Sequence, residues 1–350
     1  MEFQIIYLFM IVSGFFVAWN TGANDAANCI GAAVGSNIIS FRKGAILLGS
    51  FVFLGAVLGG GQVMETTGGG IVITTVETYE AYHGAPASEE AASALRSHFP
   101  DGRLTDVAII VALLAAGFSV LMATLLGVPL STAQCIVGGV AGAGIAVVGL
   151  KGEFFQLVML IRIFGSWIIS PILTMIVAFL AYKFLIRISQ NIKAVFKWEK
   201  ILAVLVLVSS CFFAFSLGSN AFGAGLGPLV MRFPEQRMLI AASAGLVLGI
   251  GAYTFGRRVT KTVGSDIATL DYAGALAAQF AAAMGLQVFS QWGVPVSSSQ
   301  AIVGAVIGVG LVKGRNLINI RKIIQIFISW VLSPIVAAVL ATIIYWIIMR

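Results

Sequence analysis

Long apolar segments recur along the whole chain, and they restrict the possible fold more than any other feature of the sequence. A run of about 18 or more apolar residues is long enough to cross the roughly 30 Å hydrocarbon layer of a bilayer as a helix. A membrane barrel would show alternating segments of about ten residues instead. Of the 350 residues, 59% are hydrophobic and only 10% are charged, which is far from the composition of a soluble domain. The sequence therefore predicts an all-α polytopic membrane protein.

The chain also contains an internal repeat. The segment "GVPLSTAQCIVGGVAGAG" (127–144) returns as "GVPVSSSQAIVGAVIGVG" (293–310). The segment "IFGSWIISP" (163–171) returns as "IFISWVLSP" (326–334). Self-similarity over such distances indicates that the fold is built from related units.

Two weaker matches extend the repeat toward the start of each unit. "GANDAANCIGA" (22–32) resembles "GSNAFGAGLGP" (218–228), and "QVMETTGGGI" (62–71) aligns with "RVTKTVGSDI" (258–267) at the same offset. The offset is 196 residues for these matches and 166 for the match of 127–144 with 293–310. One polar segment of about 30 residues, inserted in the first unit between them, explains the difference.

We therefore predict two homologous membrane repeats, residues 1–197 and 198–350, with the polar segment 77–105 inserted in the first.

The distribution of charge predicts how the repeats lie in the membrane. Most basic residues lie in four short regions: 42–43, 183–200, 257–261 and 313–322. By the positive-inside rule these regions are cytoplasmic, and the acidic loop 77–105 is external. Equivalent positions then face opposite sides, as for Glu65 and Lys261. The sequence therefore predicts an inverted-topology repeat of about 10–12 membrane segments with broken or re-entrant half-helices, which is typical of secondary transporters.

Other classes of function lack the residues they need. The chain has no Walker sequence for ATP, and the net charge of +7 is better explained by membrane topology than by nucleic-acid binding. The three cysteines lie singly in apolar segments, and neither histidine lies in one. A lipid-modifying enzyme would need a nucleophile with a base. We therefore expect neither an enzyme nor a resident cofactor.

The two Gly-Val-Pro motifs predict an anion site. Gly127 and Gly293 allow the chain to break, and Pro129 and Pro295 suit the first turn of a helix. Each motif thus predicts the start of a half-helix, whose free N–H groups and positive dipole end bind anions. We assign the anion to Ser131, Thr132, Gln134, Ser297, Ser298, Ser299, Gln300, Asn24 and Asn220. The alternative is that these small residues only let helices pack closely.

The motif "GANDAAN" (22–28) predicts the opposite chemistry, because it places a carboxylate and two amides within an apolar segment. A buried, unpaired aspartate is costly, so a cation or a proton is expected as its partner. We predict a coupling site at Asp25, Asn28 and Gly22, where Gly22 would break the helix and free carbonyls. If the ion is Na⁺, Asp25 and Asn24 are its expected ligands. The alternative is that Asp25 caps the broken helix.

At these residues the sequence resembles the PiT family of inorganic phosphate transporters. The resemblance covers nearly the whole chain through "GANDAAN", "GVPLST" with "GVPVSS", "SWIISP" with "SWVLSP", and "VGSDIATLD" (263–271). It implies an inverted-repeat fold of about twelve membrane segments and symport of phosphate with Na⁺ or H⁺.

The chain departs from the family pattern in its second half. Ala221 and Ala224 stand where the counterparts of Asp25 and Asn28 are expected, and glutamines stand where the family often has histidine. Coupling to a single cation or proton is therefore favoured.

Phosphate keeps a titratable proton, which in phosphate esters has a pKa of about 6. A carboxylate can accept a hydrogen bond from this proton, and fully ionised sulfate lacks it. With one carboxylate missing, a sulfate permease of the same fold is the alternative.

These inferences predict a secondary active symporter for inorganic phosphate, driven by Na⁺ or H⁺. A passive anion channel is less favoured, because repeat-related broken helices are typical of alternating access. We expect an inner or plasma membrane of prokaryotic type, with residues 183–200 cytoplasmic, the bilayer as surroundings and a homodimer as one arrangement.

Overall fold

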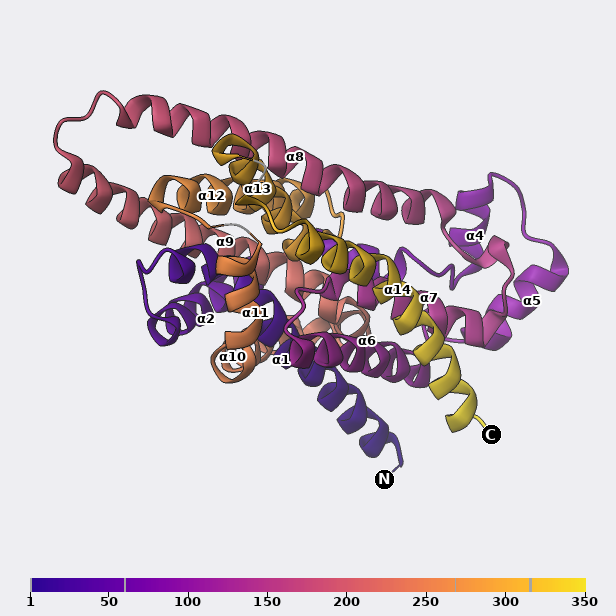
Figure 1. The fold of residues 1–350 in the computed structure, drawn as a ribbon. Helices are drawn as coiled ribbons and strands as arrows, with labels where there is room; N and C mark the ends of the chain where they lie inside the picture. The colour runs from indigo at the N-terminus through magenta and orange to yellow at the C-terminus, as the bar shows by residue number, and fades with distance from the viewer. Residues whose placement is uncertain (1, 60, 268, 315–316) are drawn as a thin grey trace.

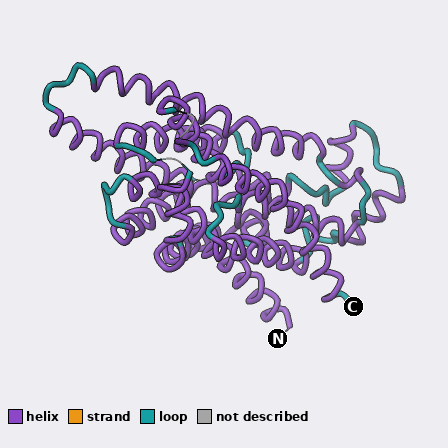
Figure 2. Tube along the Cα trace, in the orientation of Figure 1, coloured by secondary structure: helices purple, strands orange, loops and turns teal. Residues whose placement is uncertain are grey.

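The computed structural model describes residues 2–59, 61–267, 269–314 and 317–350, and nearly all of them are helical (Figure 1, Figure 2). Within these ranges no residue lies in a regular strand, and the β-type pairing consists of an isolated bridge between Val72 and Phe155. The predicted all-α fold class is confirmed.

The helices follow one another with short connections. In the first part of the chain they are α1 (Glu2–Gly35), α2 (Phe41–Leu58), α3 (Gly61–Gly69), α4 (Val76–His83), α5 (Glu89–His98), α6 (Asp106–Leu126), α7 (Thr132–Val148), η1 (Gly152–Phe154) and α8 (Leu157–Ser189). In the second part they are α9 (Val195–Arg232), η2 (Pro234–Gln236), α10 (Arg237–Phe255), α11 (Arg257–Lys261), the π-helical turn η3 (Thr262–Asp266), α12 (Tyr272–Gln291), α13 (Ser298–Lys313) and α14 (Ile320–Ile348).

Eight helices in the described part of the chain are long and apolar enough to cross a membrane: α1, α2, α6, α8, α9, α10, α12 and α14. The apolar helices α7 and α13, of 17 and 16 residues, are shorter. Together they agree with the lower end of the predicted number of membrane segments. At 1.5 Å per residue, the 33 residues of α8 extend about 50 Å, so this helix must tilt or project beyond the hydrocarbon layer.

Helices from the two repeated parts of the sequence pack against each other. Between the two parts, extensive contacts join α7 with α14, α13 with α8, α1 with α10, and α2 with α9. The centre is formed by α6 and α12, which are the most buried of the spans, and α14 is the most exposed. The starts of α7 and α13 are also buried, over residues 129–135 and 295–303.

Glycines let the short helices approach the long ones closely. A Cβ atom at Gly138 would overlap the carbonyl oxygen of Pro334, and one at Gly304 would overlap that of Pro171. These are the same contact made twice, because the two glycines and the two prolines occupy matching positions of the repeat. Small residues are the usual means of close helix packing in membranes.

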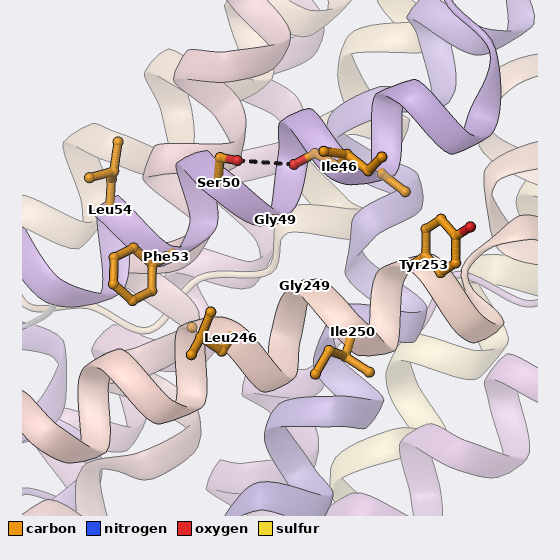
Figure 3. Close-up of a pocket in the computed structure, with 11 residues that line it drawn as sticks. Ile46, Gly49, Ser50, Phe53, Leu54, Leu246, Gly249, Ile250 and Tyr253 are labelled. Atoms are coloured by element: carbon orange, nitrogen blue, oxygen red, sulfur yellow. Dashed lines mark hydrogen bonds between the residues drawn. The ribbon is translucent and has the colours of Figure 1, made fainter.

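A second close crossing lies between α2 and α10. Gly49 and Gly249 face each other there, and Phe53, Leu246 and Ile250 project beside them into a groove of about 600 Å³ (Figure 3). The crossing fixes α2 and α10 against α9 and α1, which carry the polar residues of the predicted site.

Two ion pairs hold the N-terminal ends of the central helices. Arg232, at the end of α9, contacts Asp106 at the start of α6 with an N–O distance of 2.7 Å. Lys313, at the end of α13, lies 2.8 Å from Asp271, the residue that caps α12. The first pair joins helices from the two repeated parts of the chain, and the second joins two consecutive helices of the second part.

The structure corrects one expectation about local structure and refines another. The helix does not break at Gly22, because α1 is continuous from Glu2 to Gly35 and Gly22 instead packs directly against the backbone of Leu248 in α10. The predicted loop 77–105 contains two helices, α4 and α5, capped by Thr75 and Ser88. These two helices lie at the opposite end of the molecule from the α8–α9 connection (Figure 1).

The glycine contacts lead to a stability prediction. Gly304→Ala should lower the free energy of unfolding by about 1–3 kcal/mol, because the new methyl group forces α13 away from α8. Gly165→Ala in α8 is the matched control, since nothing lies within 4 Å of its added Cβ, and it should be neutral or slightly stabilising. Thermal unfolding in detergent measures both. Equal melting temperatures for the two variants would contradict the packing argument.

Candidate functional site

The predicted carboxylate, Asp25, lies deep inside the protein in α1. Its side chain is 4% exposed and takes part in none of the ion pairs found among the described residues. Its Oδ1 accepts a hydrogen bond from Asn28 Nδ2 at 3.2 Å, and the same nitrogen donates to Ser298 Oγ at 3.0 Å. Asn28 therefore connects the carboxylate to the first turn of α13.

A small cavity lies beside this carboxylate, where four helices meet. Its lining comes from α1, α7, α9 and the start of α13: Thr21, Asp25, Thr132, Ala133, Leu217, Asn220, Ala221, Ala224, Gly225, Val296, Ser297 and Ser298. The volume of about 10 Å³ is close to the minimum that holds one water molecule or a small ion. A tetrahedral oxyanion needs more room than this conformation provides.

Two buried amide oxygen atoms around the cavity have no hydrogen-bond partner among the described residues. They are Asn28 Oδ1 and Asn220 Oδ1. Leaving a buried acceptor unsatisfied costs about 1–3 kcal/mol, so such a group of oxygens indicates a ligand that satisfies them. Together with one carboxylate, these oxygens suit a hard cation such as Na⁺.

The starts of α7 and α13 have the same local structure. Gly127 and Gly293 adopt left-handed φ angles of 68° and 71°, a conformation that glycine tolerates best. Ser131 Oγ and Ser297 Oγ then cap the helices by accepting from backbone N–H groups three residues on, at 3.2 and 3.1 Å.

The prolines do not occupy the first turn as predicted. The helices begin at Thr132 and Ser298, so Pro129 and Pro295 lie in the extended segments that lead into the caps. The reason is that the serine caps, two residues further on, define where each helix starts.

Threonines from one part of the chain hold the Gly-Val-Pro segment of the other. Thr66 Oγ1 donates to the carbonyl oxygen of Gly293 at 2.6 Å, and Thr262 Oγ1 donates to that of Gly127 at 2.8 Å. Ser299 Oγ also donates to the Leu130 carbonyl at 3.0 Å, which joins the two segments directly. The two helix starts are therefore positioned by side chains distant in sequence.

Asn24 positions the first segment and does not line the cavity. Its Nδ2 donates to Thr124 Oγ1 at 3.0 Å and to the Val128 carbonyl at 3.1 Å, and its Oδ1 accepts from Leu130 N at 2.9 Å. Its repeat counterpart, Asn220, makes one such bond, to the Val296 carbonyl at 2.8 Å. Asn220 therefore makes fewer bonds at the second helix start than Asn24 makes at the first.

The structure brings most of the predicted site residues together. Asp25, Thr132, Asn220, Ser297 and Ser298 line the small cavity, and Asn28 contacts it through its hydrogen bonds. Ser131 caps α7 on one side of it.

The two glutamines lie elsewhere. Gln134 and Gln300 face a separate, largely apolar cavity of about 860 Å³ between α7, α8, α13 and α14. Each glutamine lies less than one turn after the first residue of its helix. Its side chain points to the face of the helix opposite the one that lines the small cavity.

Sequence reasoning missed the supporting residues. Thr21 lines the cavity, and Thr66 and Thr262 hold the two segments in place. The sequence did carry a signal for Thr66 and Thr262, because both threonines occupy the same position in the matching repeat segments 62–71 and 258–267.

A helical membrane protein in which two repeated helix starts and one buried carboxylate converge on an enclosed cavity belongs to the class of solute transporters. The model of the phosphate transporter family matches residues 21–202 and 189–341. The chain therefore belongs to this family, which confirms the resemblance seen in the sequence.

Known relatives agree with this assignment. A solved structure of a sodium-dependent phosphate transporter is similar with a TM-score of 0.82 at 25% identity, covering 99% of each chain. Inorganic phosphate transporter 2-1 of Arabidopsis thaliana chloroplasts is 26% identical over 96% of this chain and 71% of its own length. Sulfate permease CysP of Bacillus subtilis is 29% identical over 93% and 83%.

The threonine contacts lead to a reciprocal prediction. Thr262→Val should speed hydrogen exchange in segment 127–131, because it removes the hydrogen bond to the Gly127 carbonyl. Thr66→Val should speed exchange in segment 293–297, because it removes the hydrogen bond to the Gly293 carbonyl. Loss of one hydrogen bond of about 1 kcal/mol corresponds to about fivefold faster exchange. Each variant is the control for the other in exchange measured by mass spectrometry. Equal effects on both segments would contradict the assignment.

Proposed function

We propose that the chain is a secondary active symporter of inorganic phosphate, coupled to Na⁺, with H⁺ as the alternative coupling ion. One observation carries the proposal: Asp25 is buried without an ion-pair partner in the described residues, beside unsatisfied oxygens and between two helix starts. An aspartate at this depth requires a positive partner. The sodium-dependent structure to which the chain is similar supports Na⁺.

The anion would bind where the two helices begin. The first N–H groups of an α-helix have no intrahelical partner and carry partial positive charge. At α7 and α13 they lie next to the hydroxyl groups of Thr132 and Ser298, which line the cavity. Because the cavity is too small for phosphate, binding requires the two helix starts to move apart.

The cation offsets the charge of the anion in this low-dielectric site. With the cation bound at Asp25, the anion beside the helix starts no longer faces an uncompensated carboxylate. Each ligand therefore increases the affinity for the other, which is the thermodynamic basis of coupling.

The cavity wall from the second repeat supports a single coupling ion. Ala221 and Ala224 occupy the positions that match Asp25 and Asn28, and both line the cavity. These methyl groups offer no ligand to a second cation.

The arrangement in the membrane is part of the proposal. Residues 183–200 would be cytoplasmic and α4–α5 external, which agrees with their places at opposite ends of the molecule (Figure 1). The repeats 1–197 and 198–350 would then cross the membrane in opposite directions, and the site between them would open to each side in turn.

Sulfate is the second candidate substrate. The chain is similar to a sulfate permease over most of both lengths, and it carries one carboxylate at the cavity. Fully ionised sulfate lacks the proton that a carboxylate would accept from phosphate, so fewer carboxylates favour sulfate more than phosphate.

Uptake by purified protein in liposomes tests the proposal. We expect accumulation of labelled phosphate above its external concentration when Na⁺ is higher outside, and little accumulation with a pH gradient alone. Excess sulfate should compete weakly. Accumulation driven only by a pH gradient would assign H⁺ instead, dominant competition by sulfate would assign sulfate, and no accumulation under either gradient would refute symport.

Asp25→Asn tests the coupling residue. Loss of the negative charge should reduce concentrative uptake to the level of empty liposomes while the protein remains folded, because the amide cannot balance a cation. Asp101→Asn, in the exposed connection after α5, is the matched control and should transport normally. Concentrative uptake by Asp25→Asn near that of the control would remove Asp25 from the mechanism. Thermal unfolding of both variants excludes a folding defect.

A further inference from the structure

The two long helices α8 and α14 carry the same motif and contact the two helix starts in the same way. α8 packs along α13, and α14 packs along α7. Within the motif, Trp167 and Ser170 of α8 match Trp330 and Ser333 of α14. The structure thus contains two equivalent helix pairs, the α8–α13 pair and the α14–α7 pair.

In the α8–α13 pair, the tryptophan makes the hydrogen bond. Trp167 Nε1 donates to the carbonyl oxygen of Pro295 at 3.2 Å. Ser170 Oγ and Gln300 Oε1 are both buried, and neither has a hydrogen-bond partner among the described residues.

In the α14–α7 pair, the serine makes the hydrogen bond between the two helices. Ser333 Oγ donates to Gln134 Oε1 at 3.2 Å and also lies 3.1 Å from the Trp330 carbonyl of its own helix. The Trp330 indole N–H is buried without a partner in the described part of the chain. Each pair therefore makes the bond that the other lacks.

Composition does not explain this difference, because the matching positions hold the same residue types. A buried donor or acceptor without a partner is costly. A second arrangement, in which Trp330 donates to the Pro129 carbonyl and Ser170 to Gln300, would contain the same set of bonds with the pairs exchanged. Two arrangements with the same bonds have similar free energies, as a two-state element requires.

Both bonds act on the helix starts that line the site. Pro295 and Pro129 lie two residues before the capping serines, and the glutamines lie in the first turn of α13 and α7. A largely apolar cavity of about 860 Å³ lies between the two pairs, lined by both tryptophans and both glutamines. The cavity gives the pairs room to shift against each other.

We propose that Trp167 and Ser333 are positioning residues for the conformation described here, and that Trp330 and Ser170 are their counterparts in the opposite conformation. The α8–α13 and α14–α7 pairs exchange hydrogen-bond sets as the site changes its side of access. This inference rests on the proposed transport cycle, and it names the contacts that define the two states.

Fluorine NMR of 5-fluorotryptophan in the full-length protein can test it. Trp167→Phe and Trp330→Phe assign the two signals, and each residue should show a bonded and an unbonded population. The bonded fraction of Trp167 should match the unbonded fraction of Trp330 in every sample. Phosphate with Na⁺ should change both fractions in opposite directions.

Serine variants test the exchange without altering the reporters. Ser333→Ala should shift the equilibrium about fivefold toward bonded Trp330, and Ser170→Ala about fivefold toward bonded Trp167, for the loss of one hydrogen bond. The double variant should return close to the wild-type populations. Ser329→Ala is the control, because its hydroxyl donates only within its own helix, to the Ile326 carbonyl at 2.7 Å.

Shifts of both single variants in the same direction, a double variant that adds rather than cancels, or independent tryptophan populations would overturn the proposal. Complementary populations measured without substrate support it even if liposomes take up no phosphate. Uptake without complementary populations supports the transport function and refutes the exchange. Failure of the inference and failure of the proposed function are thus distinguishable.

Discussion

The structure depends on one constraint: backbone groups exposed by a helix that starts within the membrane must find partners inside the protein, because lipid offers none. The starts of α7 and α13 meet it with the capping serines, with Asn24 and with the threonines Thr66 and Thr262. Since the threonine bonds run between the repeated parts of the chain, neither part can complete its own helix start alone. The same bonds bring the two starts to one place.

The two repeated parts of the chain differ more in the side chains at the cavity than in the geometry of their helix starts. The helix starts are nearly equivalent, but α1 supplies Asp25 and Asn28 where α9 supplies Ala221 and Ala224. The bond count also differs, with three bonds from Asn24 against one from Asn220. The two repeated parts thus both contribute a capped helix start, but only α1 contributes a carboxylate to the cavity.

The sequence predicted the features that depend on local chemistry and on repetition. The glycine breaks at Gly127 and Gly293 and the burial of Asp25 follow from residue type and pattern. The intact helix at Gly22 could not be predicted, because a glycine that permits a break and one that permits close packing look identical without the neighbouring Leu248. The sequence assigns Gln134 and Gln300 to the anion site, but both face the separate apolar cavity in this conformation. Repeat position places a residue on a helix without stating which face of the helix meets the small cavity. The shared repeat position marks Thr66 and Thr262 as a pair, but the sequence does not identify their hydrogen-bond partners. These partners lie 227 and 135 residues away and are brought near only by the folded backbone.

In the proposed transport cycle, duplication would keep the free-energy difference between the two conformations small. When two helix pairs of matching sequence hold alternative sets of bonds, exchanging the sets leaves the total nearly unchanged, and the free-energy difference comes from the positions where the repeats differ. A ligand shifts such an equilibrium only by its differential affinity for the two states. Asp25 and its alanine counterpart, Ala221, are one such difference, and both line the small cavity. In the proposed cycle, a cation bound at Asp25 would therefore act directly on a residue that makes the two states unequal.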